Sequence, residues 1–185
     1  MHMSRKIEAT VDDLYNVPEN AKAEIVNGKL LLIGPTGWHP SYAASEIFVS
    51  LREYTRRSKS GRAVADNAAF VVDLPNRKSF SPYVAFYRGP DSGMKFFQGA
   101  PLFAVEVRSE GDYGPKAEKL IAQKRKDYFA AGTEVVWDVD LLSDDVVRVY
   151  RFSDPERPAI YRRGEFAEAE AVLPGWQFPV DSLFD

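Results

Sequence analysis

One run of residues, Leu102–Val107, constrains the fold of this chain more than any other. Five of its six residues are apolar, so both alternating sides of a strand here would be apolar. That pattern is typical of an interior strand whose sheet is covered on both faces. Residues 115–131 are predicted to form a helix, with Pro115 in its first turn and Gly132 as its C-terminal cap. Val135–Val139 is predicted to be the next strand.

Other segments add strands and a second long helix. Asn27-Gly28 favours the positive φ angles of a two-residue hairpin turn, so 23–33 is expected to form two strands. An amphipathic helix of about four turns is predicted beyond Pro40, from the spacing of Ala44, Ile47, Phe48 and Leu51. Further strands are expected at 69–74, 84–87 and 146–152. With no repeat or linker, residues 1–185 read as a single domain of the α/β (α+β) class.

Composition excludes several classes of function. The chain has no Cys and two His, which rules out disulfides, cysteine nucleophiles and multi-histidine zinc sites. Its longest apolar run, Leu30–Ile33, is far shorter than the roughly 20 residues of a membrane span. A net charge of -3 argues against coating nucleic acid by bulk attraction, although a local basic patch stays open. We expect a cytoplasmic protein with no membrane partner.

Glu106 breaks the apolar pattern of its strand. A carboxylate in an interior strand costs several kcal/mol unless it meets a cation, a metal ion or hydrogen-bond donors. Functional sites of open α/β sheets also gather at strand ends, where Glu106 lies. The alternative is a solvated charge where the strand leaves the sheet.

Lys124 breaks the pattern of the helix that follows. Residues Ala117, Leu120, Ile121 and Tyr128 form one apolar stripe on a helical wheel, and Lys124 falls in its middle. Such a lysine either extends its amine to solvent or pairs with an acid. Glu106 and Lys124 together could bind a divalent metal ion and orient a water for phosphodiester attack. Oxygen ligands would select Mg²⁺ or Mn²⁺.

A series of short segments carries a resemblance to a known family. They are Glu24–Leu30, His39, Ser81-Pro82, Ala104–Ser109, Lys124–Tyr128, Ala131–Asp140 and Leu173–Trp176. In this order, from about residue 8 to its end, the chain resembles the Uma-two-type restriction endonuclease family, a branch of the PD-(D/E)XK nuclease superfamily. The resemblance implies a restriction-endonuclease-like fold, which is a central mixed β-sheet flanked by helices. It also implies that the protein hydrolyses DNA with Mg²⁺ or Mn²⁺.

The resemblance also implies a set of site residues. Glu106 matches the acid of the (D/E)XK motif, and the Val107 backbone carbonyl would be a second metal ligand. Arg108 stands where the superfamily usually has its Lys, which in this family moves to the next helix, four residues before a Tyr. Lys124 and Tyr128 fit that spacing. Glu24 matches an N-terminal acid placed near the site.

The chain departs from the family pattern at one metal ligand. Where the family has Pro-Asp, this chain has Pro82-Tyr83. A neutral phenol is a poor ligand for a hard cation, so we expect weakened metal binding and impaired or lost nuclease activity. Asp112 is a candidate replacement ligand. The alternative function is an inactive descendant that binds nucleic acid or associates with itself, and a homodimer is one expected assembly.

For the remaining residues, both a functional and a purely structural interpretation are open. His39 could bind phosphate or support the site, or it could pack at the start of its helix. A basic group at the end of that helix suits either solvent or a DNA backbone; its members are Arg52, Arg56, Arg57, Lys59 and Arg62. Trp137 is expected in the core, and Asp138 and Asp140 on a solvent-exposed face of the strand.

Overall fold

A six-stranded mixed sheet forms the centre of the structure, a computed structural model that describes residues 8–18 and 21–184. Its strand order is β11-β10-β9-β8-β6-β3. The apolar run is β8 (Phe103–Val107), which pairs in parallel with β9 (Val135–Val139) and antiparallel with β6 (Val84–Tyr87). The predicted interior strand is therefore confirmed. The outer strands are β3 (Arg62–Val64), β10 (Val147–Arg151) and β11 (Asp154–Tyr161).

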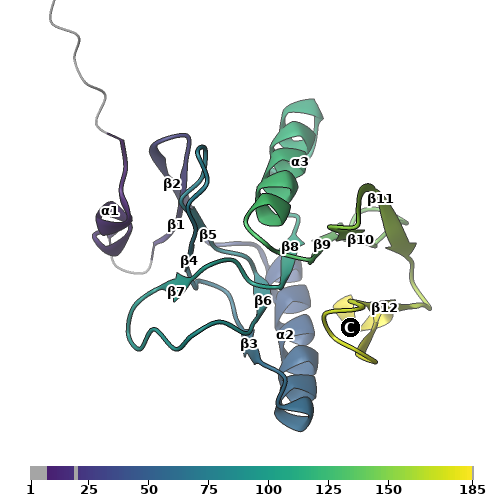
Figure 1. Cartoon of the computed structure of the whole chain (residues 1–185). Coiled ribbons are helices and arrows are strands. Elements are labelled where there is room, and N and C mark those ends of the chain that lie inside the picture. Colours follow the sequence, from purple (N-terminus) through teal and green to yellow (C-terminus); the bar gives the residue numbers. More distant parts are fainter. Residues whose placement is uncertain (1–7, 19–20, 185) are drawn as a thin grey trace, which may run out of the picture.

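Two long helices cover the two faces of this sheet (Figure 1). Because side chains alternate along a strand, Val105 and Val107 of β8 join the core cluster that includes Ile47 and Leu51 of α2 (Trp38–Ser58). On the other face, Ala104 packs in a cluster with Tyr128 of α3 (Pro115–Ala130). Glu106 shares the face of Ala104, so it points toward α3.

The helix α3 agrees with its predicted bounds but not with its predicted buried stripe. Pro115 opens it, and Gly132 follows its end with a φ of 106°. Its buried residues are Asp127, Tyr128 and Phe129, whereas Leu120 is 63% exposed. The correction has a simple cause: the buried residues of α3 lie in its C-terminal part, whereas residues of its middle, such as Leu120, border a cavity.

The N-terminal segments form a small layer beside α3 (Figure 1). After α1 (Val11–Tyr15), the predicted hairpin is present as β1 (Lys22–Val26) and β2 (Lys29–Ile33). A second small sheet contains β4 (Phe70–Val71), β5 (Ser79–Phe80) and β7 (Phe97–Gln98). The strand predicted at 69–74 is thus shorter than expected, since only two of its residues pair as a strand.

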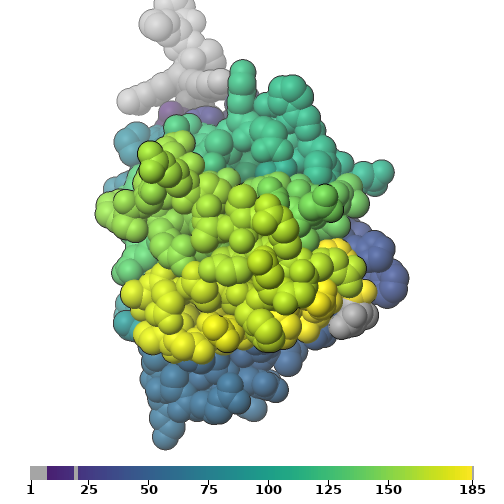
Figure 2. Space-filling model, turned by 90° about the vertical axis from the view of Figure 1, so that its right-hand side faces the viewer, coloured from purple at the N-terminus to yellow at the C-terminus, as the bar shows by residue number. Residues whose placement is uncertain are grey.

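The C-terminal segments lie against the other side of the molecule, where Figure 2 shows them between α3 and α2. They are β12 (Phe166–Glu168), β13 (Gln177–Pro179) and the 3₁₀ turn η1 (Val180–Leu183). Trp137 is fully buried and stacks on Trp176, with ring centroids 5.2 Å apart, which confirms its core position. No helix in the described ranges is long and apolar enough to cross a membrane.

Candidate active site

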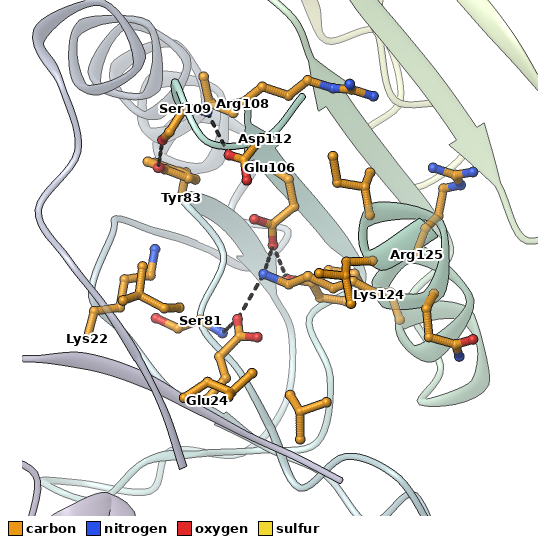
Figure 3. A pocket seen from close by; sticks show the side chains of 18 of the residues that line it. Lys22, Glu24, Ser81, Tyr83, Glu106, Arg108, Ser109, Asp112, Lys124 and Arg125 are labelled. Atoms are coloured by element: carbon orange, nitrogen blue, oxygen red, sulfur yellow. Dashed lines mark hydrogen bonds and ion pairs between the residues drawn. The ribbon is translucent and has the colours of Figure 1, made fainter. Parts of the chain in front are cut away.

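A cavity of about 760 Å³ opens between the β1–β2 hairpin, the end of β8 and α3 (Figure 3). Both charged and apolar side chains line it. Glu24, Glu106 and Lys124 come from three different elements and meet in this cavity, as Figure 3 shows. The predicted convergence of these three residues is therefore present in the structure.

Lys124 bridges the two carboxylates. Its Nζ lies 2.8 Å from Glu106 Oε1 and 2.9 Å from Glu24 Oε1. Burial alone would lower the pKa of Lys124, but the charges of Glu106 and Glu24 raise it above its ordinary value. The ammonium is thus charged at neutral pH. Of the two interpretations left open by the sequence, pairing with an acid is correct.

Glu24 is a buried carboxylate with three partners. It is 4% exposed, and besides Lys124 it accepts hydrogen bonds from the Ser81 backbone N–H at 2.8 Å and Arg77 Nη1 at 2.7 Å. Burial opposes its ionisation, yet the charges of Lys124 and Arg77 lower its pKa to about 2. Glu24 is therefore a fixed anion that anchors the two cations.

Arg77 and Asp127 complete the buried charges, and the sequence reasoning missed both. Arg77 Nε donates to Asp127 Oδ2 at 2.9 Å, and the two side chains are 5% and 4% exposed. Asn76 and Gln123 also donate to Asp127, each at 2.9 Å. A signal for Asp127 existed, because it lies three residues after Lys124, a spacing that makes two residues neighbours on a helix surface.

We call Glu24, Arg77, Glu106, Lys124 and Asp127 the Lys124 cluster. Within it, Glu106 is the most solvent-accessible acid, with 23% of its side chain exposed. The Tyr128 hydroxyl donates to Glu106 Oε1 at 2.6 Å. Burial, followed by the charge of Glu106, raises the pKa of Tyr128 well above its ordinary value, so the phenol stays a donor. These contacts hold Glu106 through Oε1 and leave Oε2 outside them.

Tyr83 lines the same cavity as Glu106. Its backbone N–H donates to the Val105 carbonyl at 3.0 Å, and Val84 also pairs with Val105, so residue 83 lies near the strand end that carries Glu106. The Tyr83 hydroxyl lies 3.0 Å from Ser109 Oγ and 3.2 Å from Thr36 Oγ1, while Lys22 Nζ sits 4.3 Å from its ring centroid. An Asp at position 83 would therefore add a second carboxylate to this cavity.

A second set of charges, the Arg108 cluster, contains the buried Arg108, Asp138 and Asp140 together with the exposed Glu118. Arg108 donates to both Asp138 oxygens at 2.8 Å each, and it also pairs with Glu118 of α3. Asp138 and Asp140 are 3% and 6% exposed. The prediction that they face solvent is therefore wrong, because the two-pronged guanidinium of Arg108 neutralises charge inside the protein.

Of three other predicted site residues, two line the cavity and one does not. Asp112 lines the cavity, but one of its oxygens, Oδ2, accepts from the Ser109 backbone N–H at 2.7 Å. Val107 also lines the cavity. His39 is exposed beside Trp38 and does not line the cavity, which agrees with a place at the helix start and not with a supporting role. The basic end of α2 lies about 30 Å along that helix from His39.

The donor atoms available to a metal ion are few. Within residues 8–18 and 21–184, no group of three or more His, Asp or Glu side chains could hold a metal ion. Glu106 Oε2 and the Val107 carbonyl are the oxygen atoms that the predicted ligand set still provides, since Tyr83 contributes a neutral phenol. Both are hard donors of the kind that Mg²⁺ prefers.

The comparisons with known proteins agree with this architecture. A crystal structure from Anabaena variabilis, described as a putative nuclease belonging to DUF820, is 17% identical and has a TM-score of 0.74. The similarity covers 95% of this chain and 97% of the other. No curated protein matches the chain. The fold is thus that of a nuclease-like α/β protein, as predicted.

The sequence comparison is more specific. Residues 9–181 match the Uma2 family, described as "Putative restriction endonuclease". The chain belongs to this family, and the resemblance seen in its motifs is confirmed.

Proposed function

We propose that this protein is a divalent-cation-dependent endonuclease that hydrolyses DNA phosphodiester bonds, with its activity lowered by Tyr83. The observation that carries the proposal is the Lys124 ammonium, held within 2.9 Å of both Glu24 and Glu106 in a cavity. Membership of a family of restriction endonucleases supports the choice of a nucleic acid as the substrate.

Lys124 supplies positive charge to the reaction. Its raised pKa keeps it protonated at neutral pH, so it does not serve as a general base. A fixed ammonium in a cavity stabilises the negative charge that develops on the phosphoryl oxygens in the transition state. Glu24 acts as a positioning residue, because it holds Lys124 without being the more accessible carboxylate.

Glu106 is the candidate for orienting and deprotonating the attacking water. It is partly exposed at the cavity, and its Oε2 takes no part in the contacts with Lys124 and Tyr128. A carboxylate within hydrogen-bond distance of a water can accept its proton during attack. Tyr128 fixes the orientation of Glu106 through its short hydrogen bond.

The donors at the site fit a hard cation that is bound weakly. Glu106 and the Val107 carbonyl would hold Mg²⁺ or Mn²⁺, and such ions complete their coordination with water and substrate phosphate oxygens. When bound, the ion would neutralise phosphate charge and activate the water. The side chain of Tyr83 adds no anionic ligand, which supports weakened binding.

The direct test is DNA cleavage by the wild-type protein and the Tyr83→Asp variant with Mg²⁺ or Mn²⁺. We expect Tyr83→Asp to cleave faster, because Tyr83 and Glu106 line one cavity and the new carboxylate would add an anionic metal ligand there. Tyr83→Phe is the matched control, since it removes the hydroxyl without adding a ligand, and it should not gain activity. Absence of cleavage by the wild type and Tyr83→Asp, when both are folded, would refute the proposal.

A second candidate function is an inactive descendant that binds nucleic acid. The observation that favours it is the set of hydroxyl contacts around Tyr83, which give the phenol a settled position at the cavity. In that case Tyr83→Asp alone would restore cleavage, and the wild-type protein would bind DNA without cutting it. A homodimer and a cytoplasmic location stay predictions of the sequence.

A further inference from the structure

Two leucines on different elements give the cavity an apolar lining. Leu31 of β2 is 46% exposed and Leu120 of α3 is 63% exposed, and both line the cavity. Ile33 and Ile121 line it beside them. A single exposed leucine is ordinary on a protein surface. Exposed leucines on both the hairpin and the helix that border one cavity indicate a ligand with an apolar surface of its own.

The charged groups lie in the same cavity and are recessed. The side chains of Lys124 and Glu106 are 19% and 23% exposed. A strand in a duplex presents mainly its charged backbone to a protein, because its bases are stacked and paired inside. The leucines would then contact charged phosphates, and burying a leucine against a charged group gives no favourable free energy. An unpaired nucleotide offers both a phosphate for the cations and a base face for the leucines.

Arg125 is a further cation at the cavity wall. It lines the cavity with its side chain pointing away from the Lys124 ammonium (Figure 3), and its guanidinium carbon lies 3.7 Å from the ring centroid of Tyr150. Arg77, Arg108 and Lys124 are held by carboxylates, whereas none of the ion pairs formed within the described ranges involves Arg125. Stacking on Tyr150 orients the planar group without neutralising it, which suits phosphate binding.

We infer that the cavity binds an unpaired nucleotide of single-stranded nucleic acid, with the base against Leu31 and Leu120 and a phosphate on Arg125. This inference rests on the proposed function, since it names the form of substrate that enters the same site. The cavity volume of about 760 Å³ lies within the range of sites that enclose small ligands.

The test is binding without cleavage. A fluorescently labelled single-stranded oligonucleotide and the same strand in a duplex are titrated with the wild-type protein in EDTA, and anisotropy is measured. We expect about tenfold tighter binding to the single strand. Leu31→Ser and Leu120→Ser should each weaken single-strand binding by about threefold to tenfold. Met94→Ser is the matched control, because Met94 is fully exposed outside the cavity lining and should leave binding unchanged.

The role of Arg125 is tested by salt dependence. Arg125→Gln should lower the slope of log affinity against log salt by about 0.7, the value for one contact to a single-stranded phosphate. Lys126→Gln removes the same charge from the next, exposed residue and should leave the slope unchanged. Equal slopes for Arg125→Gln and the wild type would overturn the assignment of Arg125.

Failure of this inference is distinguishable from failure of the proposed function. Preferred binding and cleavage of duplex would overturn the single-strand inference while the nuclease proposal stands. Preferred binding of the single strand, with no cleavage by the wild type or Tyr83→Asp, would support the inference and refute the nuclease proposal. Leucine variants that bind as the wild type does would contradict the apolar role of the cavity walls.

Discussion

The two charge clusters on the α3 face of the sheet differ in how their cations are held. In the Arg108 cluster, the guanidinium binds both oxygens of Asp138 at 2.8 Å, and its own side chain is 7% exposed. In the Lys124 cluster, one ammonium is shared between Glu24 and Glu106, and the second of these acids faces a cavity. The first arrangement leaves little hydrogen-bonding capacity for a ligand, whereas the second retains an accessible carboxylate.

This difference indicates which charges stabilise the fold and which form a functional site. A two-pronged Arg–carboxylate pair fixes geometry, and here it ties β9 to the first turn of α3 through Glu118. An ammonium is a point charge that can redirect its hydrogen bonds toward an arriving phosphate. We therefore expect the Arg108 cluster to affect stability alone and the Lys124 cluster to affect both stability and chemistry.

The largest effect is expected for Arg77→Met. This change leaves the buried carboxylates of Glu24 and Asp127 without their shared cation. Breaking a buried ion pair on one side should lower the free energy of unfolding by about 3–5 kcal/mol. Urea denaturation followed by circular dichroism measures it. A loss below about 1 kcal/mol would show that Arg77 does not hold the cluster together.

The dependence of stability on acid pH should distinguish the Lys124 cluster from the Arg108 cluster, because Glu24 belongs to the first. Its pKa of about 2 lies below the ordinary value of 4.5, so its stabilisation is present above pH 4.5 and is lost as the pH falls toward 2. That shift corresponds to on the order of 3 kcal/mol. Glu24→Gln, less stable at pH 7, should lose less further stability in this window. Denaturation at several pH values checks this, and parallel curves for both proteins would contradict it.

A smaller effect is expected for Arg108→Lys. The lysine keeps the charge but loses the two-pronged pairing with Asp138, which should cost about 2 kcal/mol of stability. Thermal denaturation gives the change, and nucleic-acid binding per folded molecule should match the wild type. Arg108 also lines the cavity, so a binding loss without destabilisation would give it a role in ligand binding and break the comparison.

The smallest stability effect is expected for Tyr128→Phe. The variant removes the donor to Glu106 Oε1 but keeps the ring, which stacks on Phe80 at a centroid distance of 4.0 Å. We expect a loss of about 1 kcal/mol in unfolding free energy together with a larger fractional loss of cleavage. Chemical denaturation and initial rates, compared on the same preparation, measure the two. Unchanged cleavage would show that Tyr128 does not position Glu106.

Much of the fold could be predicted because its signals are local. The strand Val135–Val139 has the predicted bounds, and Gly132 follows α3 with a positive φ, as expected. Glu106 and Lys124 could be found because each breaks a regular apolar pattern. Each of these predictions depends only on residues that are close together in the sequence.

The rest depends on partners distant in sequence. Arg77 lies in a polar turn and gives no local sign that it reaches Glu24 and Asp127, about fifty residues away on either side. Asp138 alternates like a solvent-facing residue, but it is buried in an interior strand, where Arg108 neutralises its charge. Leu120 fits the apolar stripe, but the cavity beside α3 leaves it exposed. Tertiary charge pairing and surface shape decide these positions.

The most direct measurement compares DNA cleavage rates of Glu106→Gln and Glu118→Gln with Mn²⁺, in the wild type and in the Tyr83→Asp background. Each change removes one negative charge, from the Lys124 cluster and from the Arg108 cluster respectively. Abolished cleavage for Glu106→Gln, with rates per folded molecule retained for Glu118→Gln, is the expected result. Cleavage that survives Glu106→Gln unchanged, or depends equally on Glu118, would contradict the assignment of the Lys124 cluster as the catalytic centre.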